Sequence, residues 1–235
     1  MKEFLKRHLN PSIIAWIKYF RMVLVRIAQQ LIYFYGRFIK TPINLRQNNT
    51  KRDRKLEIGP GDERIPGFET VNVVWNRNVD YVADASRKLP FADESFQIVY
   101  ASHVLEHTAW FNISNTLAEW IRVLNHGGLL EIWVPDGYKL SRLLCDIEEG
   151  KDRAEWNDGW RPLNPEGDPY KWLNGRILYG ANTNYPSWHI SIITPKYLTF
   201  LLNNLGLVDI EILSASEVRG FDHGWINLGL RGRKP

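Results

Sequence analysis

The chain has little cysteine and no long uninterrupted apolar run. Cys145 is the one cysteine among 235 residues, so an intramolecular disulfide and any metal site built on several thiolates are excluded. A chain without disulfides is compatible with a reducing compartment, and we expect it in the cytoplasm. A membrane span needs about 20 predominantly apolar residues. The most apolar stretch fails this requirement, because Lys18, Arg21 and Arg26 interrupt it.

Acidic residues are scarce at the N-terminal end. Residues 1–55 contain thirteen Lys or Arg and two Asp or Glu, a net charge of +11, whereas residues 56–235 contain seventeen and twenty-four, a net charge of −7. We therefore divide the chain into a basic arm, residues 1–54, and an acidic body, residues 55–235. An acidic body argues against a nucleic-acid partner. A basic arm suits an anionic surface, most simply a membrane.

The arm has the periodicity of an amphipathic helix. Apolar residues recur at steps of three and four from Ile13 to Ile39, and Lys, Arg and Gln fall on the opposite face. We expect residues 13–40 to lie at the inner face of an anionic membrane. The alternatives are that this helix packs on the body or on a second copy of the chain in a homodimer.

The ends of this helix are indicated by proline and glycine. Pro11 predicts its start, and Gly36 or Thr41-Pro42 predicts its end. Residues 44–55 are polar and lack periodicity, so they predict a linker.

The body begins with Lys55-Leu56-Glu57-Ile58-Gly59-Pro60-Gly61. This pattern predicts a buried strand that ends in a glycine turn. Glycine tolerates a positive φ and lets the backbone come close to a ligand. In open α/β sheets, ligands bind at the carboxyl ends of the strands, which is where Glu57 falls.

Strands and helices alternate along the rest of the body, which indicates an α/β fold with a mainly parallel sheet. The first two connections are too short for a crossover helix. The Gly127-Gly128 pair predicts the end of a helix. An aromatic-rich insertion spans residues 137–193, and the last two strands predict an antiparallel hairpin. The predicted strands are 69–74, 79–83, 96–101, 129–134, 208–213 and 225–231, and the predicted helices are 116–124, 138–147 and 195–205.

Several segments, in this order and at this spacing, resemble class I S-adenosylmethionine-dependent methyltransferases. The resemblance is firm over residues 55–135 and looser beyond. It is strongest to small methyltransferases associated with bacterial surface-polysaccharide synthesis, which share the short first connection and a late Tyr-Gly…His element, here Tyr179-Gly180 and His189. The matching segments are Leu56-Glu-Ile-Gly-Pro-Gly61, Val82-Ala-Asp-Ala-Ser86, Leu89-Pro-Phe91, Ser95-Phe-Gln-Ile-Val99, Ser102-His-Val-Leu-Glu-His107, Glu119-Trp-Ile-Arg-Val-Leu-Asn-His-Gly-Gly128 and Trp133-Val-Pro-Asp136.

The resemblance implies a Rossmann-like, seven-stranded sheet with S-adenosylmethionine across the strand ends. The glycine turn would approach the methionine part, and Glu57 would accept from its amino group through water. Asp84 and the Ala85 N–H would bind adenine. Ser102 and His103 would lie under the sulfonium. The expected cofactor-binding residues are Glu57, Gly59, Pro60, Gly61, Asp84, Ala85, Ser102 and His103.

One position departs from the family. An acid usually ends the second strand and holds the ribose hydroxyls, and here that position aligns with Val74. Either Asn72 or Asn76 substitutes, or cofactor binding is weaker by on the order of 1 kcal/mol or somewhat more. This departure leaves open a non-catalytic, methyltransferase-like scaffold.

A hydroxyl acceptor calls for a general base, and histidine or aspartate serves near neutral pH. We predict catalytic roles for His103, Asp136 and His189, with His107 as a further candidate. A helix cap is the alternative for Asp136, and a structural histidine is the alternative for His189. The segment His103-Val-Leu-Glu-His107 also matches a zinc peptidase pattern, but it directly follows a strand and no third ligand is obvious. We therefore predict no metal site.

The substrate is indicated more weakly than the reaction. Aromatic side chains stack on the apolar faces of sugars, although they also build small cores. Together with the basic arm and the resemblance, they predict O-methylation of a surface glycan or a lipid-linked saccharide. The alternatives are a lipid or quinone acceptor, or the scaffold. The aromatic residues of the insertion are Trp156, Trp160, Tyr170, Trp172, Tyr179, Tyr185 and Trp188.

Overall fold

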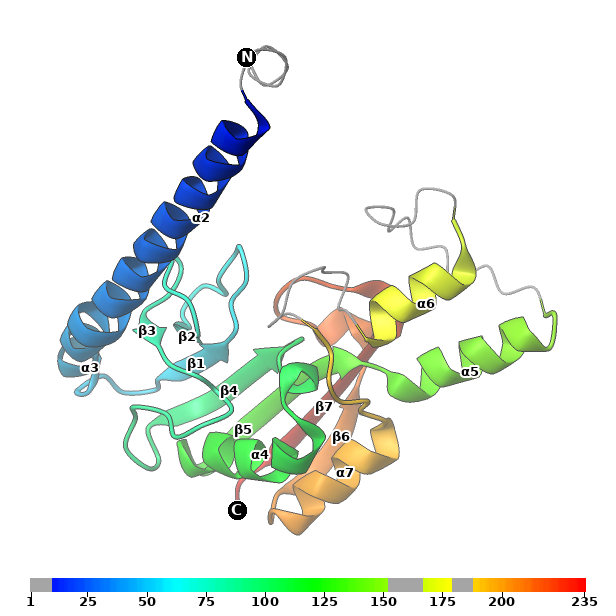
Figure 1. Ribbon diagram of the computed structural model, residues 1–235. Helices are drawn as coiled ribbons and strands as arrows, with labels where there is room; N and C mark the ends of the chain where they lie inside the picture. Colours follow the sequence, from blue (N-terminus) through cyan, green and yellow to red (C-terminus); the bar gives the residue numbers. More distant parts are fainter. Residues whose placement is uncertain (1–9, 152–166, 179–187) are drawn as a thin grey trace.

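A seven-stranded sheet forms the centre of the protein (Figure 1). The computed structural model describes residues 10–151, 167–178 and 188–235. The strand order is β3-β2-β1-β4-β5-β7-β6, with β7 antiparallel to its neighbours β5 and β6 and the other pairs parallel. This Rossmann-like fold confirms the predicted fold class. The strands are β1 Lys55–Ile58, β2 Glu69–Asn72, β3 Tyr81–Val82, β4 Phe96–Ser102, β5 Leu124–Pro135, β6 Val208–Leu213 and β7 Asn227–Arg233.

The helices are unevenly distributed along the chain. In the fully described stretch from β1 to β3, no helix lies between the strands, as the short connections predicted. Within the described residues the α-helices are α2 Pro11–Phe34, α3 Thr41–Asn48, α4 Ile113–Arg122, α5 Gly137–Glu148, α6 Pro169–Ile177 and α7 Pro195–Asn204. The shorter helices are the π-helix η1 Tyr35–Lys40 and the 3₁₀ turns η2 Leu105–His107, η3 Trp110–Asn112, η5 Ala215–Glu217 and η6 Gly224–Ile226.

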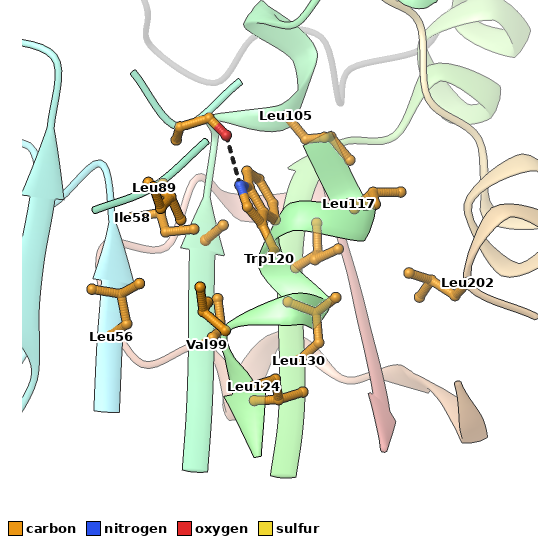
Figure 2. Close-up of a cluster of buried hydrophobic side chains, with 14 of the residues drawn as sticks. Leu56, Ile58, Leu89, Val99, Leu105, Leu117, Trp120, Leu124, Leu130 and Leu202 are labelled. Carbon is orange, nitrogen blue, oxygen red and sulfur yellow. Dashed lines mark hydrogen bonds between the residues drawn. The ribbon is translucent and has the colours of Figure 1, made fainter. Parts of the chain in front are cut away.

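The main core lies between the sheet and the helices α4 and α7. Figure 2 shows strand residues such as Val99 and Leu130 beside Leu117 and Trp120 of α4, in one cluster of buried side chains. Trp120 is fully buried, and its Nε1 donates a hydrogen bond to the carbonyl oxygen of Ala85 over 2.9 Å. The core therefore holds the loop after β3 in place at the carboxyl end of the sheet.

The helix of the arm is longer than the sequence predicted. The helical backbone runs from Pro11 through Gly36 and Pro42 to Asn48, so neither predicted end is correct, and residues 44–48 are helix rather than linker. Proline lacks an amide hydrogen and clashes with the carbonyl one turn earlier. The π-helical turn directly before α3 accommodates it, because a π-helix shifts the hydrogen-bonding partners by one residue.

Packing against β3 explains why the helix does not stop at Gly36. A Cβ on Gly36 would lie 2.5 Å from Cγ2 of Val82 and 2.6 Å from Cβ of Trp75. Thr41 Oγ1 donates to the Gly36 carbonyl over 2.9 Å and accepts from the Val82 N–H over 2.8 Å. Asn44 Nδ2 donates to the Asp80 carbonyl over 2.7 Å. We call these contacts the arm joint; they attach the arm to the edge of the sheet.

The rest of the arm, α2, projects away from the sheet (Figure 1). Its apolar side chains are exposed, with Trp16 and Leu31 each 65% accessible. Trp16 stacks on Phe20 with ring centroids 5.5 Å apart. In the part of the chain that the structure describes, no helix is both long and apolar enough to span a bilayer.

The end of α4 also differs from the prediction. The helix ends at Arg122, and β5 begins two residues later at Leu124. Gly127 has a φ of +73° and lies inside β5, where the register with β4 shifts. The glycine pair therefore forms an irregularity in a strand instead of ending a helix.

Candidate functional site

Two pockets meet at the carboxyl ends of the central strands. The first, which we call the Asp84 pocket, has a volume of about 460 Å³, and the second, the Glu57 pocket, about 810 Å³. Both are lined by Gly59, Gly61 and His103. The chain crosses from β1 to β2 on one side and reaches β4 on the other, so the pockets lie at the switch point where open α/β sheets bind ligands.

The Asp84 pocket has an apolar wall and a polar rim. Its apolar lining includes Ile58, Val71 and Val104. Asp84 lies on the rim, where its Oδ1 accepts from the Ser86 amide over 2.9 Å and from the Ser86 hydroxyl over 2.6 Å. This short turn orients the carboxylate at the pocket. An apolar slot with a hydrogen-bonding edge suits a planar aromatic base.

The Glu57 pocket contains the buried acid that follows from the β1 pattern. Glu57 is 4% exposed, and its Oε2 accepts from the Ile65 amide over 2.8 Å. Burial raises the pKa of the Glu57 carboxyl, against the opposing effects of the Ile65 amide and of Arg64. An ammonium group in this pocket would favour the ionised carboxylate and offset that burial.

The structure places all eight expected cofactor residues on the walls of these pockets. Pro60 and Ser102 line the Glu57 pocket with Glu57, and Ala85 lines the Asp84 pocket with Asp84. The glycine turn and His103 border both. The parallel strands bring these residues together, because each residue lies at or just beyond the carboxyl end of β1, β3 or β4.

The turn after β1 fits a ligand that comes close to the backbone. Gly59 has a φ of +71°, and a Cβ there would lie 2.5 Å from Cγ2 of Val104. Only glycine satisfies both conditions. At Gly61 a Cβ would meet no atom within 4 Å, so the space beside it is open to a bound molecule.

β2 ends before Val74, the position that the sequence aligned with the ribose contact. The strand ends at Asn72, which pairs with Val82 of β3 and lines the Asp84 pocket. Val74 is 58% exposed and lines neither pocket. Of the two residues that could substitute for the missing acid, Asn72 lines the Asp84 pocket. The predicted strand is two residues too long, because the β-rich run of sequence continues past the last paired residue.

His103 is the one predicted catalytic residue that reaches both pockets. Its backbone has a φ of +54°, uncommon for a residue other than glycine. Its Nε2 lies 2.9 Å from Asn227 Oδ1, and its Nδ1 lies 3.2 Å from Glu106 Oε1. The ring also packs on His223, with centroids 3.7 Å apart.

Asp136 is a helix cap and lines neither pocket. Its Oδ1 accepts from the Tyr138 amide over 2.9 Å and from the Lys139 amide over 3.1 Å, at the start of α5. The side chain is buried, with 3% of the residue exposed. Of the two interpretations that the sequence left open, the geometry supports the cap.

His189 also lies off the two pockets. Its Nδ1 is 2.8 Å from the Arg176 carbonyl oxygen, and its Nε2 is 3.7 Å from Glu106 Oε1. It lines a separate cavity of about 20 Å³ beneath α5 and α6. Burial is the main cause that lowers the pKa of His189.

Sequence patterns did not indicate the residues that close the Glu57 pocket from the far side. Arg219, Phe221 and His223 line it from the segment before β7. Burial, followed by the nearby charge of His103, lowers the pKa of His223 to about 4, so its ring is neutral near pH 7. These residues are more than one hundred positions beyond β4, and only the tertiary fold brings them together.

The aromatic residues of the insertion do not act as one group. Trp172 is 1% exposed and stacks on Trp225, with centroids 5.9 Å apart, so it belongs to a small core. Tyr170 is 46% exposed. Trp188 is half-buried. The predicted contacts of Trp156, Trp160, Tyr179 and Tyr185 lie outside the described residues.

One family model matches part of the chain that forms this site. Residues 67–132, which contain Asp84, Ser102 and His103, match the model of a protein family described as a methyltransferase domain. With the fold and the two pockets, this match supports S-adenosylmethionine as the cofactor and methyl transfer as the reaction. No curated protein matches the chain.

Solved structures with a similar fold include two SAM-dependent methyltransferases. The one from Thermotoga maritima is 17% identical with a TM-score of 0.46, and the match covers 94% of this chain and 100% of that chain. The one from Archaeoglobus fulgidus is 16% identical with a TM-score of 0.44, over 96% and 100%. The [4+2]-cyclase SpnF is also similar, at 16% identity and a TM-score of 0.42, over 83% and 80%. The likeness concerns the fold alone.

Proposed function

We propose that the protein transfers the methyl group of S-adenosylmethionine to a hydroxyl of a lipid-linked saccharide or surface glycan. The observation that supports this proposal best is the pair of joined pockets around the Gly59 turn. The Asp84 pocket offers an apolar slot for adenine, and the Glu57 pocket offers a buried carboxylate for the amino group. The bound cofactor would supply a methyl carbon already activated by a positive sulfur.

The residues of the chain then have to position the acceptor and remove its proton. Exposed aromatic rings near the pockets provide surfaces on which a sugar ring can stack. Phe221, on the wall of the Glu57 pocket, is 76% exposed, and Trp110 and Phe111, close in sequence to the pocket residue Thr108, are 72% and 73% exposed. Of the three predicted catalytic residues, His103 alone borders both pockets. We therefore assign the role of base to His103, a role that requires its Nε2 to exchange the contact with Asn227 Oδ1 for the acceptor hydroxyl.

The His103→Asn variant tests this assignment. Asparagine tolerates the positive φ of this position. We expect methyl transfer to saccharide acceptors to fall by about 10²–10⁴-fold, the usual contribution of a general base, and the affinity for S-adenosylmethionine, which His103 is also expected to contact, to fall much less. Transfer is measured with radiolabelled cofactor and binding by calorimetry. A comparable loss in Asp136→Asn, with His103→Asn fully active, would move the role to Asp136. If the protein methylates quinones but no saccharide, the acceptor is a quinone and the saccharide proposal is wrong.

The strand-end position gives a second test, at the ribose contact. We expect Asn72→Asp to bind S-adenosylmethionine about tenfold more tightly, because a carboxylate accepts stronger hydrogen bonds than an amide. Val74→Asp adds the same charge at an exposed site outside the pockets, and its affinity should equal that of the unmodified protein. Calorimetric titration compares the two variants. An equal gain in affinity in both variants would reveal a general charge effect. A gain in affinity in Val74→Asp alone would place the ribose contact at position 74, as the sequence alignment predicted.

We further propose that α2 binds an anionic membrane surface. The helix carries three cations and no acid, and its apolar side chains are exposed. Such a helix lies in the interface with its apolar side chains in the lipid and its cations near phosphate. A membrane-bound enzyme would meet its lipid-linked acceptor at the same surface, which is why we favour that acceptor. Packing of α2 on a second copy of the chain is the competing proposal.

A further inference from the structure

Three side chains with metal-binding chemistry converge behind the wall of the Asp84 pocket. Glu106 and His107 belong to η2, just after β4, and His189 lies 82 residues after His107, near the end of the insertion. One potential ligand atom from each lies within 4.8 Å of the other two. His189 Nε2 and Glu106 Oε1 are 3.7 Å apart. Two ligands on a tetrahedral zinc ion, each at about 2.1 Å, are separated by about 3.4 Å, close to that distance.

Both histidine rings are held in the orientation that metal ligands usually have. Nδ1 of His107 lies 3.0 Å from the Trp188 carbonyl oxygen, and Nδ1 of His189 lies 2.8 Å from the Arg176 carbonyl oxygen. A carbonyl oxygen only accepts, so each Nδ1 carries the hydrogen. Nε2 of each ring is then the nitrogen left to bind a metal ion. Metal-bound histidines commonly donate their other ring N–H to a backbone carbonyl in this way.

Glu106 is a buried carboxylate without sufficient hydrogen bonds. The residue is 2% exposed, and within the described parts of the chain no hydrogen bond of good geometry reaches either carboxylate oxygen. His103 Nδ1 faces Oε1 at 3.2 Å and offsets part of the charge. Burying an ionised carboxylate with incomplete pairing is costly. A cation bound between Glu106 and the two Nε2 lone pairs would remove that cost.

We propose that Glu106, His107 and His189 form a site for a divalent transition metal, with Zn²⁺ as the first choice. Two imidazoles and one carboxylate are a ligand set that zinc uses in sites with an open position. The cavity of about 20 Å³ beside Glu106 and His189 has room for a water molecule as a fourth ligand. The site differs from the zinc peptidase pattern in the sequence, because His189 replaces His103 as the second imidazole.

The position of the site indicates a structural role. The backbone around His189 already contacts the η2 segment: the Ile190 and Ser191 amides donate to the Glu106 carbonyl over 2.9 and 3.2 Å. Ser191 Oγ also donates to the Thr108 carbonyl. A metal here would join the end of the insertion to the wall of the Asp84 pocket, which His107 lines. It would fix residues 188–193 against the η2 segment without touching the reacting atoms.

Metal content of the full-length protein tests the proposal. Protein stripped with a chelator, then dialysed against micromolar Zn²⁺, should contain about one Zn²⁺ per chain and melt at a higher temperature than the stripped form. His189→Asn and His107→Asn should each bind Zn²⁺ at least about tenfold more weakly. Co²⁺ in place of Zn²⁺ should give the visible absorption of a four-coordinate site with imidazole ligands, and His189→Asn should lose it.

Two control variants make the result specific. His126→Asn removes an exposed histidine that pairs with Glu94 over 3.0 Å, away from the cluster, and should keep its zinc. His103 faces Glu106 without being a ligand, so His103→Asn should weaken zinc binding less than His107→Asn or His189→Asn, whereas the peptidase pattern requires an equal loss. Absence of stoichiometric zinc in the unmodified protein, or zinc retained by both His107→Asn and His189→Asn, would overturn the proposal. Each readout is independent of methyl transfer.

Discussion

Gly59→Ala should abolish measurable binding of S-adenosylmethionine. The new Cβ would lie 2.5 Å from Cγ2 of Val104, at a residue whose φ of +71° disfavours any side chain. The turn would have to move, and it borders both pockets. We expect the affinity to fall by at least about 100-fold, which corresponds to about 2.7 kcal/mol, in a calorimetric titration.

Gly206→Ala is the matched control for this experiment. Gly206 has a φ of +84°, a Cβ there would meet no atom within 4 Å, and the residue follows α7 far from the pockets in the sequence. Both substitutions carry the conformational cost of a side chain in the left-handed region, about 1–2 kcal/mol. Only Gly59→Ala should lose the cofactor. Full binding by a folded Gly59→Ala protein would show that the turn does not contact the cofactor.

Neutralising the cations of α2 should keep the protein at the bottom of a liposome flotation gradient. Each Lys or Arg near an anionic surface contributes about 1 kcal/mol to binding. The triple variant Lys18→Gln/Arg21→Gln/Arg26→Gln should therefore bind vesicles that contain phosphatidylglycerol roughly 100-fold more weakly than the unmodified chain. Salt should weaken the binding of the unmodified protein, because these charges are exposed.

The control for flotation keeps the same change of charge outside α2. Lys51→Gln/Arg52→Gln/Lys196→Gln removes three exposed cations and should float like the unmodified chain. A variant that lacks α2 should keep Tyr35 and all later residues, because the arm joint begins at Gly36 and loss of the joint would disturb β3. If both triple variants float equally, the proposal that α2 binds a membrane is wrong. If sedimentation shows a dimer that only the α2 variant dissociates, α2 binds a second copy of the chain instead.

The sequence predicted those parts of the fold that depend on local patterns. The strands, the short first connections and the closing hairpin follow from alternation and spacing, and the pocket walls follow because their residues lie at strand ends. Asp84 and Gly59 could be named without a structure for that reason. The local pattern gave a wrong prediction at Gly127. A glycine pair that follows a helix indicates the end of that helix, even where, as here, a strand has already begun before the glycines.

What the sequence could not predict depends on contacts between distant residues. Gly36 indicates a helix end until Val82 and Trp75 are seen to pack against it. Asp136 is equally compatible with a base or a cap, and only its hydrogen bonds to the first amides of α5 decide. His189 and Glu106 are more than eighty positions apart, so no spacing rule relates them.

The unbroken helical backbone from Pro11 to Asn48 fixes the orientation of the arm relative to the body. Each residue of an α-helix turns the chain by about 100° and advances it by about 1.5 Å. The number of residues between α2 and Thr41 therefore sets the direction in which the arm's apolar stripe faces relative to the mouths of the two pockets. Gain or loss of one residue would rotate that stripe by more than a quarter of a circle, whereas a change of seven would nearly restore it. The arm thus has a fixed angular setting on the body, so any surface that binds its apolar stripe would face the two pockets at a fixed angle.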